Sequence, residues 1–142
     1  MAQITTLQER LRNASGLGPV LGASCEAFEA MLTVIRAHED PGSVFFAPLV
    51  MAAALAADGR DASGSAPSMS RLLSRSGADT DDRPLADSAE TAARVVADLA
   101  QLVEVRLTQV AGQAVDPDER EACEQAAQCA AAIYELLGWG EP

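Results

Sequence analysis

The stretch that decides the fold spans residues 85–111 and reads LADSAETAARVVADLAQLVEVRLTQVA. Its large apolar residues recur every three or four positions, the spacing of one face of an α-helix; they are Val96, Leu99, Val103, Leu107 and Val110. Val95 and Leu102 widen this stripe, as is typical of a central helix packed on more than one side. Asp87 and Glu90 have the spacing of a capping box, which predicts a helix over residues 85–111.

A second apolar stripe precedes this one in the chain, with steps of three and four between its members. They are Leu21, Cys25, Phe28, Leu32 and Ile35. Pro19 suits the first turn of a helix, where its missing N–H costs nothing, and the Asp-Pro-Gly sequence at 40–42 is expected to end the helix. Upstream, Thr6 and Glu9 have capping-box spacing and predict a short helix over residues 7–14.

Two further helices complete the pattern. Residues 47–58 are apolar on all sides, which predicts a helix buried on most sides, with Gly59 just past its end. The last helix has a clear start, because Asp116 is a good cap, Pro117 suits the first position and Glu119 has capping-box spacing. Small residues are prominent on its expected inner face, which comprises Ala122, Ala126, Cys129, Ile133 and Leu136.

These patterns predict an all-α fold, a bundle of four to five mostly antiparallel helices. We expect residues 1–138 to form one helical-bundle domain and residues 139–142 to form a short tail. Residues 59–84 are rich in glycine, serine and aspartate, which predicts a mobile loop region. A short amphipathic turn near Met69 and Leu72 interrupts it. Whether this region is a functional lid or a plain connector is left open by the residues themselves.

Composition excludes several classes of function. The chain has 142 residues, 21 acids, 10 arginines and no lysine, for a net charge of −11. A nucleic-acid binder needs a basic surface, and Schiff-base or P-loop chemistry needs a lysine. Residues 85–142 carry 11 of the acids and 3 of the arginines, so the acidic surface is concentrated there. It serves solubility or docks a basic partner, and mimicry of DNA is a third interpretation.

Other features concern the compartment. The N-terminus lacks the pattern of a secretory signal. The longest uncharged apolar stretch, residues 44–57, is too short for the roughly 20 residues that span a bilayer. Three cysteines without a secretion signal indicate free thiols. We expect a cytoplasmic protein, and the abundance of alanine and arginine is typical of a GC-rich bacterial genome.

Catalytic constellations are sparse in this sequence. One histidine cannot supply the ligands of a catalytic zinc or di-iron site, so we expect neither metal nor cofactor. Cys25 and His38 are 13 residues apart on one expected helix, roughly 20 Å along its axis, which excludes a Cys–His dyad within it. Glu26 and Glu29 share a face, but a solvated acidic surface explains them. These observations favour a protein that is not an enzyme.

Arg106 is the most informative charged residue, because it lies among apolar residues of the longest helix. Its side chain either reaches solvent from the helix edge, pairs with an acid of another helix, or binds an anionic ligand. The third alternative predicts a small-molecule site between helices, with Cys129 and Met51 as further lining residues.

The first functional hypothesis is a protein–protein interaction module that self-associates, as a dimer, or docks on another protein. Trp139 in the tail and the aromatic pair Phe45 and Phe46 are the candidate anchors for a partner. The alternative is a small-molecule-binding bundle or cofactor-free enzyme with a pocket near Arg106.

Overall fold

A computed structural model describes residues 2–38, 40–64 and 88–138 of the chain. The helices in these ranges are α1 (Ala2–Asn13), α2 (Leu17–Arg36), α3 (Phe46–Gly64), α5 (Ala89–Ala111) and α6 (Pro117–Leu137). No strand occurs within the described ranges. The predicted all-α bundle is therefore confirmed.

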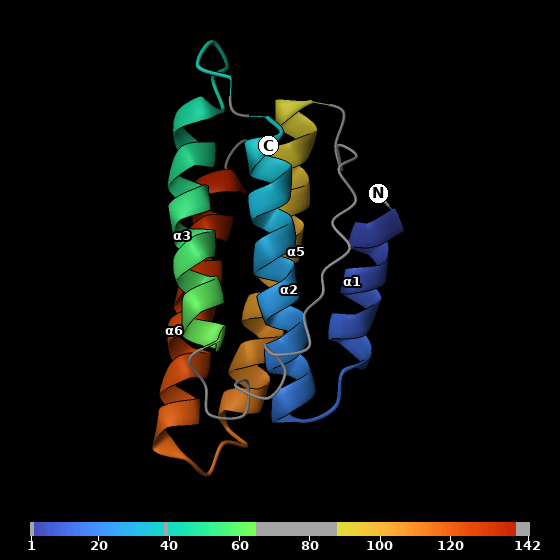
Figure 1. Ribbon diagram of the computed structural model, residues 1–142, viewed down its shortest axis with the longest axis vertical. Helices are drawn as coiled ribbons and strands as arrows, with labels where there is room; N and C mark the ends of the chain where they lie inside the picture. Colours follow the sequence, from blue (N-terminus) through green and yellow to red (C-terminus); the bar gives the residue numbers. More distant parts are fainter. Residues whose placement is uncertain (1, 39, 65–87, 139–142) are drawn as a thin grey trace.

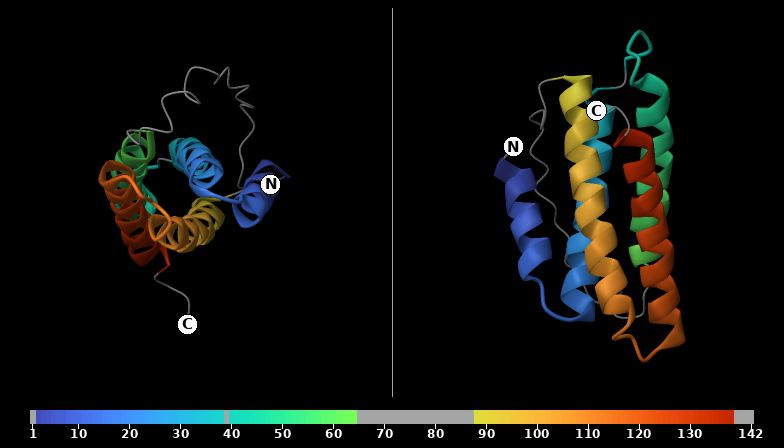
Figure 2. Two further views of the ribbon diagram at one scale, coloured as in Figure 1. Left: turned by 90° about the horizontal axis from the view of Figure 1, so that it is seen from below. Right: turned by 180° about the vertical axis from the view of Figure 1, so that it is seen from behind.

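Four long helices form a ring, and the short N-terminal helix lies outside it (Figures 1 and 2). Around the ring, α2 packs on α3, α3 on α6, α6 on α5 and α5 on α2, while α1 packs against α2 and α5. Neighbours in the ring run antiparallel, as expected (Figure 1). α3 and α5 run in the same direction: each begins at the upper end of the bundle in Figure 1 and ends at its lower end.

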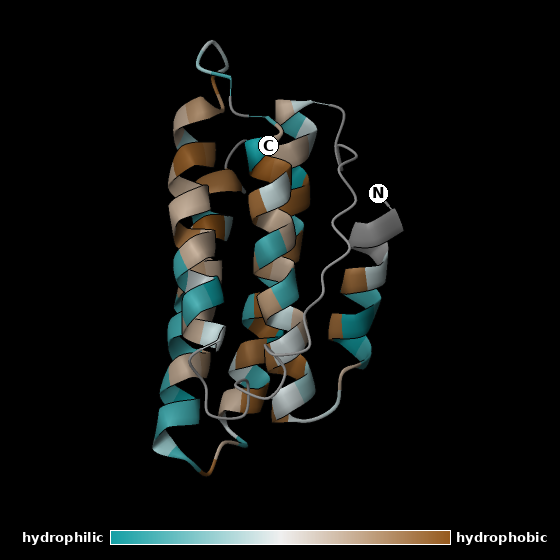
Figure 3. Ribbon diagram, in the orientation of Figure 1, coloured by the Kyte–Doolittle hydropathy of each residue, from teal (hydrophilic) through white to brown (hydrophobic). Residues whose placement is uncertain are grey.

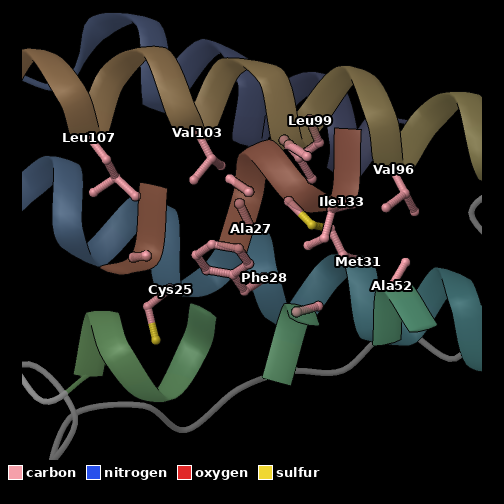
Figure 4. Packing of buried hydrophobic residues seen from close by; sticks show 14 of the residues in the cluster. Cys25, Ala27, Phe28, Met31, Ala52, Val96, Leu99, Val103, Leu107 and Ile133 are labelled. Atoms are coloured by element: carbon pink, nitrogen blue, oxygen red, sulfur yellow. The ribbon is translucent and has the colours of Figure 1, made fainter. Parts of the chain in front are cut away.

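The two apolar stripes expected at the centre of the bundle are confirmed. Every member of the α5 stripe is buried, from Val96 to Val110, and so is every member of the α2 stripe, from Leu21 to Ile35. Figure 4 shows the α5 row pointing toward Phe28 and toward residues of α2 and α6. α5 contacts α1, α2 and α6, which agrees with its predicted central position.

The role of Gly59 in the structure differs from the helix end that its sequence context predicted. Gly59 does not follow the third helix but lies inside it, because α3 continues to Gly64. The ring of Phe28 packs directly on this glycine, and a Cβ built there would lie 2.5 Å from the Cε1 and Cζ atoms of Phe28. Residues 59–64 are consequently helical, whereas a loop was expected.

The third helix is also less buried than its uniform apolarity predicted. Its buried side is a narrow stripe with helical spacing, made of Leu49, Ala52, Ala56, Gly59 and Ser63. The opposite side of its first half is exposed, with Val50 42% and Met51 55% accessible. α3 is therefore an edge helix that buries one side only.

Several helix ends differ from expectation by a few residues. α1 begins at Ala2, which places Thr6 inside the helix instead of at its cap. α2 begins at Leu17, after Gly16 at φ 95°, and ends at Arg36, four residues before Asp40. Glycine suits this φ because it has no Cβ to clash.

The caps of the last two helices follow general rules. Ser88 caps α5, its hydroxyl accepting a hydrogen bond of 3.1 Å from the N–H of Thr91, where Asp87 was expected to be the cap. Asp116 caps α6 and Pro117 takes its first position, as predicted, and the Asp116 carboxylate accepts from the N–H of Asp118.

The buried face of α6 is rotated slightly from the expected one. Cys129 and Leu136 are only half-buried, and the buried set is instead Ala122, Cys123, Ala126, Ala127, Ala130, Ile133 and Leu137. The expected loop over 65–84, its turn near Met69 and Leu72, and the tail with Trp139 lie outside the described residues. Among the described helices, α2 is long and apolar enough to cross a bilayer, but 61% of that stretch is buried inside the bundle, as in a core helix.

We predict that Gly59→Ala lowers the free energy of unfolding by about 2 kcal/mol, because the new Cβ must displace the Phe28 ring. Urea denaturation followed by circular dichroism measures this change. Gly18→Ala is the matched control in α2, since nothing lies within 4 Å of its Cβ position. Equal stability of the two variants would contradict the close packing of Phe28 on Gly59.

Candidate functional site

The outer side of α3 is an exposed apolar surface. Ala47, Val50, Met51 and Ala54 are all exposed and lie within about 100° of one another around the helix axis. We call these four residues the α3 face. Figure 3 shows the apolar first half of α3 and the hydrophilic second half, which lies toward Gly64.

The α3 face is exposed because of the way the other side of the helix packs. The narrow stripe from Leu49 to Ser63 faces the bundle, where α3 contacts α2 and α6. No helix in the described part of the chain covers the opposite side (Figure 2). Two of the large side chains of the first half, Val50 and Met51, are therefore exposed to solvent, whereas Leu49 joins the core.

The segment before α3 extends this surface. Val44 is 87% exposed, the most exposed large apolar residue of this segment. Phe45 is half-buried against the core, and Phe46, the first residue of α3, is also half-buried. The two phenylalanines considered as partner anchors thus contact the protein itself with part of their surface, while Val44 projects outward.

Charged residues are confined to the second half of α3. Residues 46–57 contain none, and the first acid is the exposed Asp58. Arg60 follows and pairs with Asp61, with 3.5 Å between Nε and Oδ1. About three turns of exposed helix surface are therefore uncharged in a protein of net charge −11.

Arg106 uses its guanidinium to hold α1 against α5. Its Nε donates a hydrogen bond of 2.8 Å to the carbonyl oxygen of Leu11, and one terminal nitrogen donates to the carbonyl oxygen of Ala14. The other terminal nitrogen donates to the Gln109 side chain. These carbonyls belong to the last turn of α1 and the residue after it, where helices lack backbone donors. Backbone carbonyls were not among the partners considered for this arginine from the sequence.

The three residues proposed to line a ligand site are not brought together. Arg106 faces α1, Met51 is exposed on α3, and Cys129 lies on α6 beside a hollow shared with α3. That hollow has a volume of about 350 Å³ and is open to solvent; Leu55, Asp58 and Gln125 also line it.

A second hollow lies between α5 and α6. Its volume is about 610 Å³, and it is a wide open groove with mixed charge, lined by Glu104, Arg120 and Glu124 among others. Neither hollow encloses a ligand-sized space away from solvent. In the described ranges no group of three or more His, Cys, Asp or Glu side chains is placed to hold a metal ion.

The thiols are held in their unreactive form. Burial raises the pKa of Cys25 to about 11, and the Glu29 carboxylate adds to the effect. Burial likewise raises the pKa of Cys123 to about 11, with a further contribution from Glu119. The pKa of Cys129 is raised by burial and by Asp58. Because the thiolate is the nucleophile, none of the three is activated for covalent chemistry.

Comparison with known proteins adds no relative. No family model matches the chain, and neither a curated protein nor a solved structure is significantly similar to it. The α3 face is therefore the candidate site on geometric grounds alone. One sequence signal could have revealed it: the small residues that follow Leu49 at helical spacing form the buried stripe, and Val50 and Met51 lie outside it.

We predict that Arg106→Ala loosens α1, because three hydrogen bonds of the guanidinium are lost. Amide hydrogen exchange should accelerate over residues 6–14, and the free energy of unfolding should fall by about 1–2 kcal/mol. Arg94→Ala on the same helix is the control, since its exposed ion pair with Glu90 contributes roughly 0.5 kcal/mol or less. Unchanged exchange over α1 would show that Arg106 does not hold it.

The raised thiol pKa values predict slow alkylation and a defined pH dependence. With iodoacetamide at pH 8, intact mass should show Cys129 modified first and Cys25 and Cys123 modified only after unfolding in urea. The unfolded chain loses its thiol protons first, so stability should decrease as pH rises from about 9 to about 11. Native-state modification of Cys25 as fast as that of Cys129 would contradict this burial.

Proposed function

We propose that this protein is a small, non-catalytic interaction module of a bacterial cytoplasm and that the α3 face is its contact surface. The observation that carries the proposal is the exposure of Val50 and Met51 on an uncharged helix surface. Soluble proteins rarely expose large contiguous apolar patches, and such patches are typical of binding sites.

The chemistry of the remaining residues supports a non-catalytic role. The thiols are protonated, and the guanidinium of Arg106 already donates to three acceptors. The hollows beside Cys129 and between α5 and α6 are open to solvent and do not bring Arg106, Cys129 and Met51 together. Arg106 lines neither of these two hollows.

The size of the contact also supports a module that associates reversibly. Methionine and valine are well suited to such surfaces, because methionine adapts to irregular partners and both bury apolar area without needing hydrogen bonds. Fully burying one such side chain contributes about 1.5–3 kcal/mol, and Val50 and Met51 are already half-buried, so each can contribute about half of that.

The test is photo-cross-linking in living cells with a benzophenone amino acid at position 51. We expect a covalent adduct from position 51 and none from Gln101, an exposed polar position on the outer side of α5. Adding Val50→Glu should abolish the adduct, because it places a charge in the apolar contact.

The mass of the adduct separates the kinds of partner. Twice the mass of the chain indicates a second copy, and any other mass indicates a different protein. The absence of an adduct at position 51, in cells where the protein is folded, would overturn the proposed function.

A further inference from the structure

We infer that α1 is a hinged strap, which leaves the bundle as one unit from Gly16 while the ring of α2, α3, α5 and α6 stays folded. The strap lies against α2 and α5, on the side of the ring away from α3, so it is independent of the α3 face (Figure 2). Its opening uncovers the sides of α2 and α5 that it packs against, and it releases the guanidinium of Arg106 from two carbonyl oxygens.

The ring is closed without α1. Each of its four helices packs against two neighbours within the ring, and core residues such as Phe28, Val103 and Ile133 meet at its centre (Figure 4). α1 is added to this ring from outside (Figure 2). A helix in that position can detach without breaking the contacts among the other four, as locally opening units of proteins do.

Few side chains of α1 are buried. Among residues 6–13, whose side chains the structure describes, Leu11 is the one that is fully buried, and Leu7 is half-buried. By contrast, α2 and α5 bury eleven side chains each. Because buried apolar area supplies most of the stability of a helix in a protein, α1 is held much more weakly than its neighbours.

The remaining contacts that hold α1 are polar. The Nε of Arg106 donates a hydrogen bond of 2.8 Å to the carbonyl oxygen of Leu11, and a terminal nitrogen donates to the carbonyl oxygen of Ala14. Arg10 pairs with Glu26 of α2, and both side chains are about half exposed. Water can replace such partners when the helix leaves, so these contacts break and re-form reversibly.

Charge draws the strap back to the bundle. α1 carries Glu9, Arg10 and Arg12, a net charge of +1, and the remainder of the chain carries −12. The attraction acts mainly between exposed groups, so salt screens it. Opening should therefore become more frequent as the ionic strength rises.

Gly16 is built as the joint of this strap. It lies between the two helices with φ 95° and ψ 166°, a conformation that is essentially restricted to glycine. The joint is also open, because a Cβ at this position would meet only the Cδ of Pro19, at 3.9 Å. Glycine adopts negative φ as readily as positive φ, so a change at this one residue redirects α1.

The first experiment is amide hydrogen exchange of the full chain, followed by NMR at several urea concentrations below the unfolding transition. A free helix of 12 residues is marginal in water, so α1 should unwind once it detaches. We expect residues 6–13 to share one protection factor, at least ~10-fold lower than that of the α2 core and nearly independent of urea. Protection of α1 equal to that of α2 would overturn the strap. A gradual rise from residue 6 to residue 13, which indicates fraying from the terminus, would overturn it too.

The joint is tested by Gly16→Ala. The closed conformation is strained for alanine, so exchange over residues 6–13 should accelerate by at least ~5-fold while that of α5 stays unchanged. Gly18→Ala is the matched control two residues away, where nothing lies within 4 Å of the added Cβ, and it should change the exchange of α1 by less than ~2-fold. Equal effects of the two variants would show that Gly16 is not the joint.

The independence of the ring is tested by Leu11→Ala, with the buried thiols of Cys25 and Cys123 as reporters of ring opening. Exchange of α1 should accelerate by at least ~10-fold, because its buried anchor is lost, while alkylation of both thiols by iodoacetamide stays as slow as in the unmodified protein. Gly59→Ala, which strains the ring between α2 and α3, is the control that should accelerate alkylation of Cys25. If Leu11→Ala accelerates alkylation as much as exchange, α1 and the ring open together and the inference is wrong.

Discussion

The arrangement of the bundle depends on the close approach of α3 to α2 at Gly59, where the Phe28 ring lies on the helix backbone. A side chain at this position would have to displace the Phe28 ring, and Ala52 and Ala56, the preceding buried residues of α3, are also small. The buried stripe of α3 consists of Leu49 and four small residues, and Val50 and Met51 lie on the opposite side of the helix, exposed to solvent. The same packing that closes the ring therefore creates the surface available to a partner.

The charged residues of the described helices serve mainly to join helices and to form their exposed surfaces. Arginine, the only strongly basic residue type in the chain, is used structurally: Arg106 holds the end of α1 and Arg10 pairs with Glu26 across α1 and α2. Exposed acids occur on α1, α2, α5 and α6, whereas the first half of α3 is uncharged. Within the described residues, the exposed and uncharged first half of α3 therefore contrasts with the acidic exposed surface of α6.

Residue spacing was a sound guide wherever a helix buries one broad face. The stripes of α2 and α5 and the Asp116–Pro117 start of α6 could be read directly, because helical periodicity and capping are local properties. α3 was misread because local sequence cannot distinguish a glycine that ends a helix from one that admits a neighbouring ring, as Gly59 does. Uniform apolarity likewise hid which side of α3 is exposed. The two carbonyl partners of Arg106 could not be predicted either, since they are backbone atoms more than 90 positions away in the chain.

The alanine-rich contact between α3 and α6 has a thermodynamic consequence. Alanine has no rotamers to lose, so its burial carries no side-chain entropy cost, whereas each long side chain costs up to about 2 kcal/mol. Its burial also removes less apolar area from water, and the heat capacity change of unfolding scales with that area. We therefore expect a stability curve that is flatter with temperature than that of a leucine-rich bundle of equal length. A chain with 29 alanines gains less from burial, but it also loses less conformational freedom on folding.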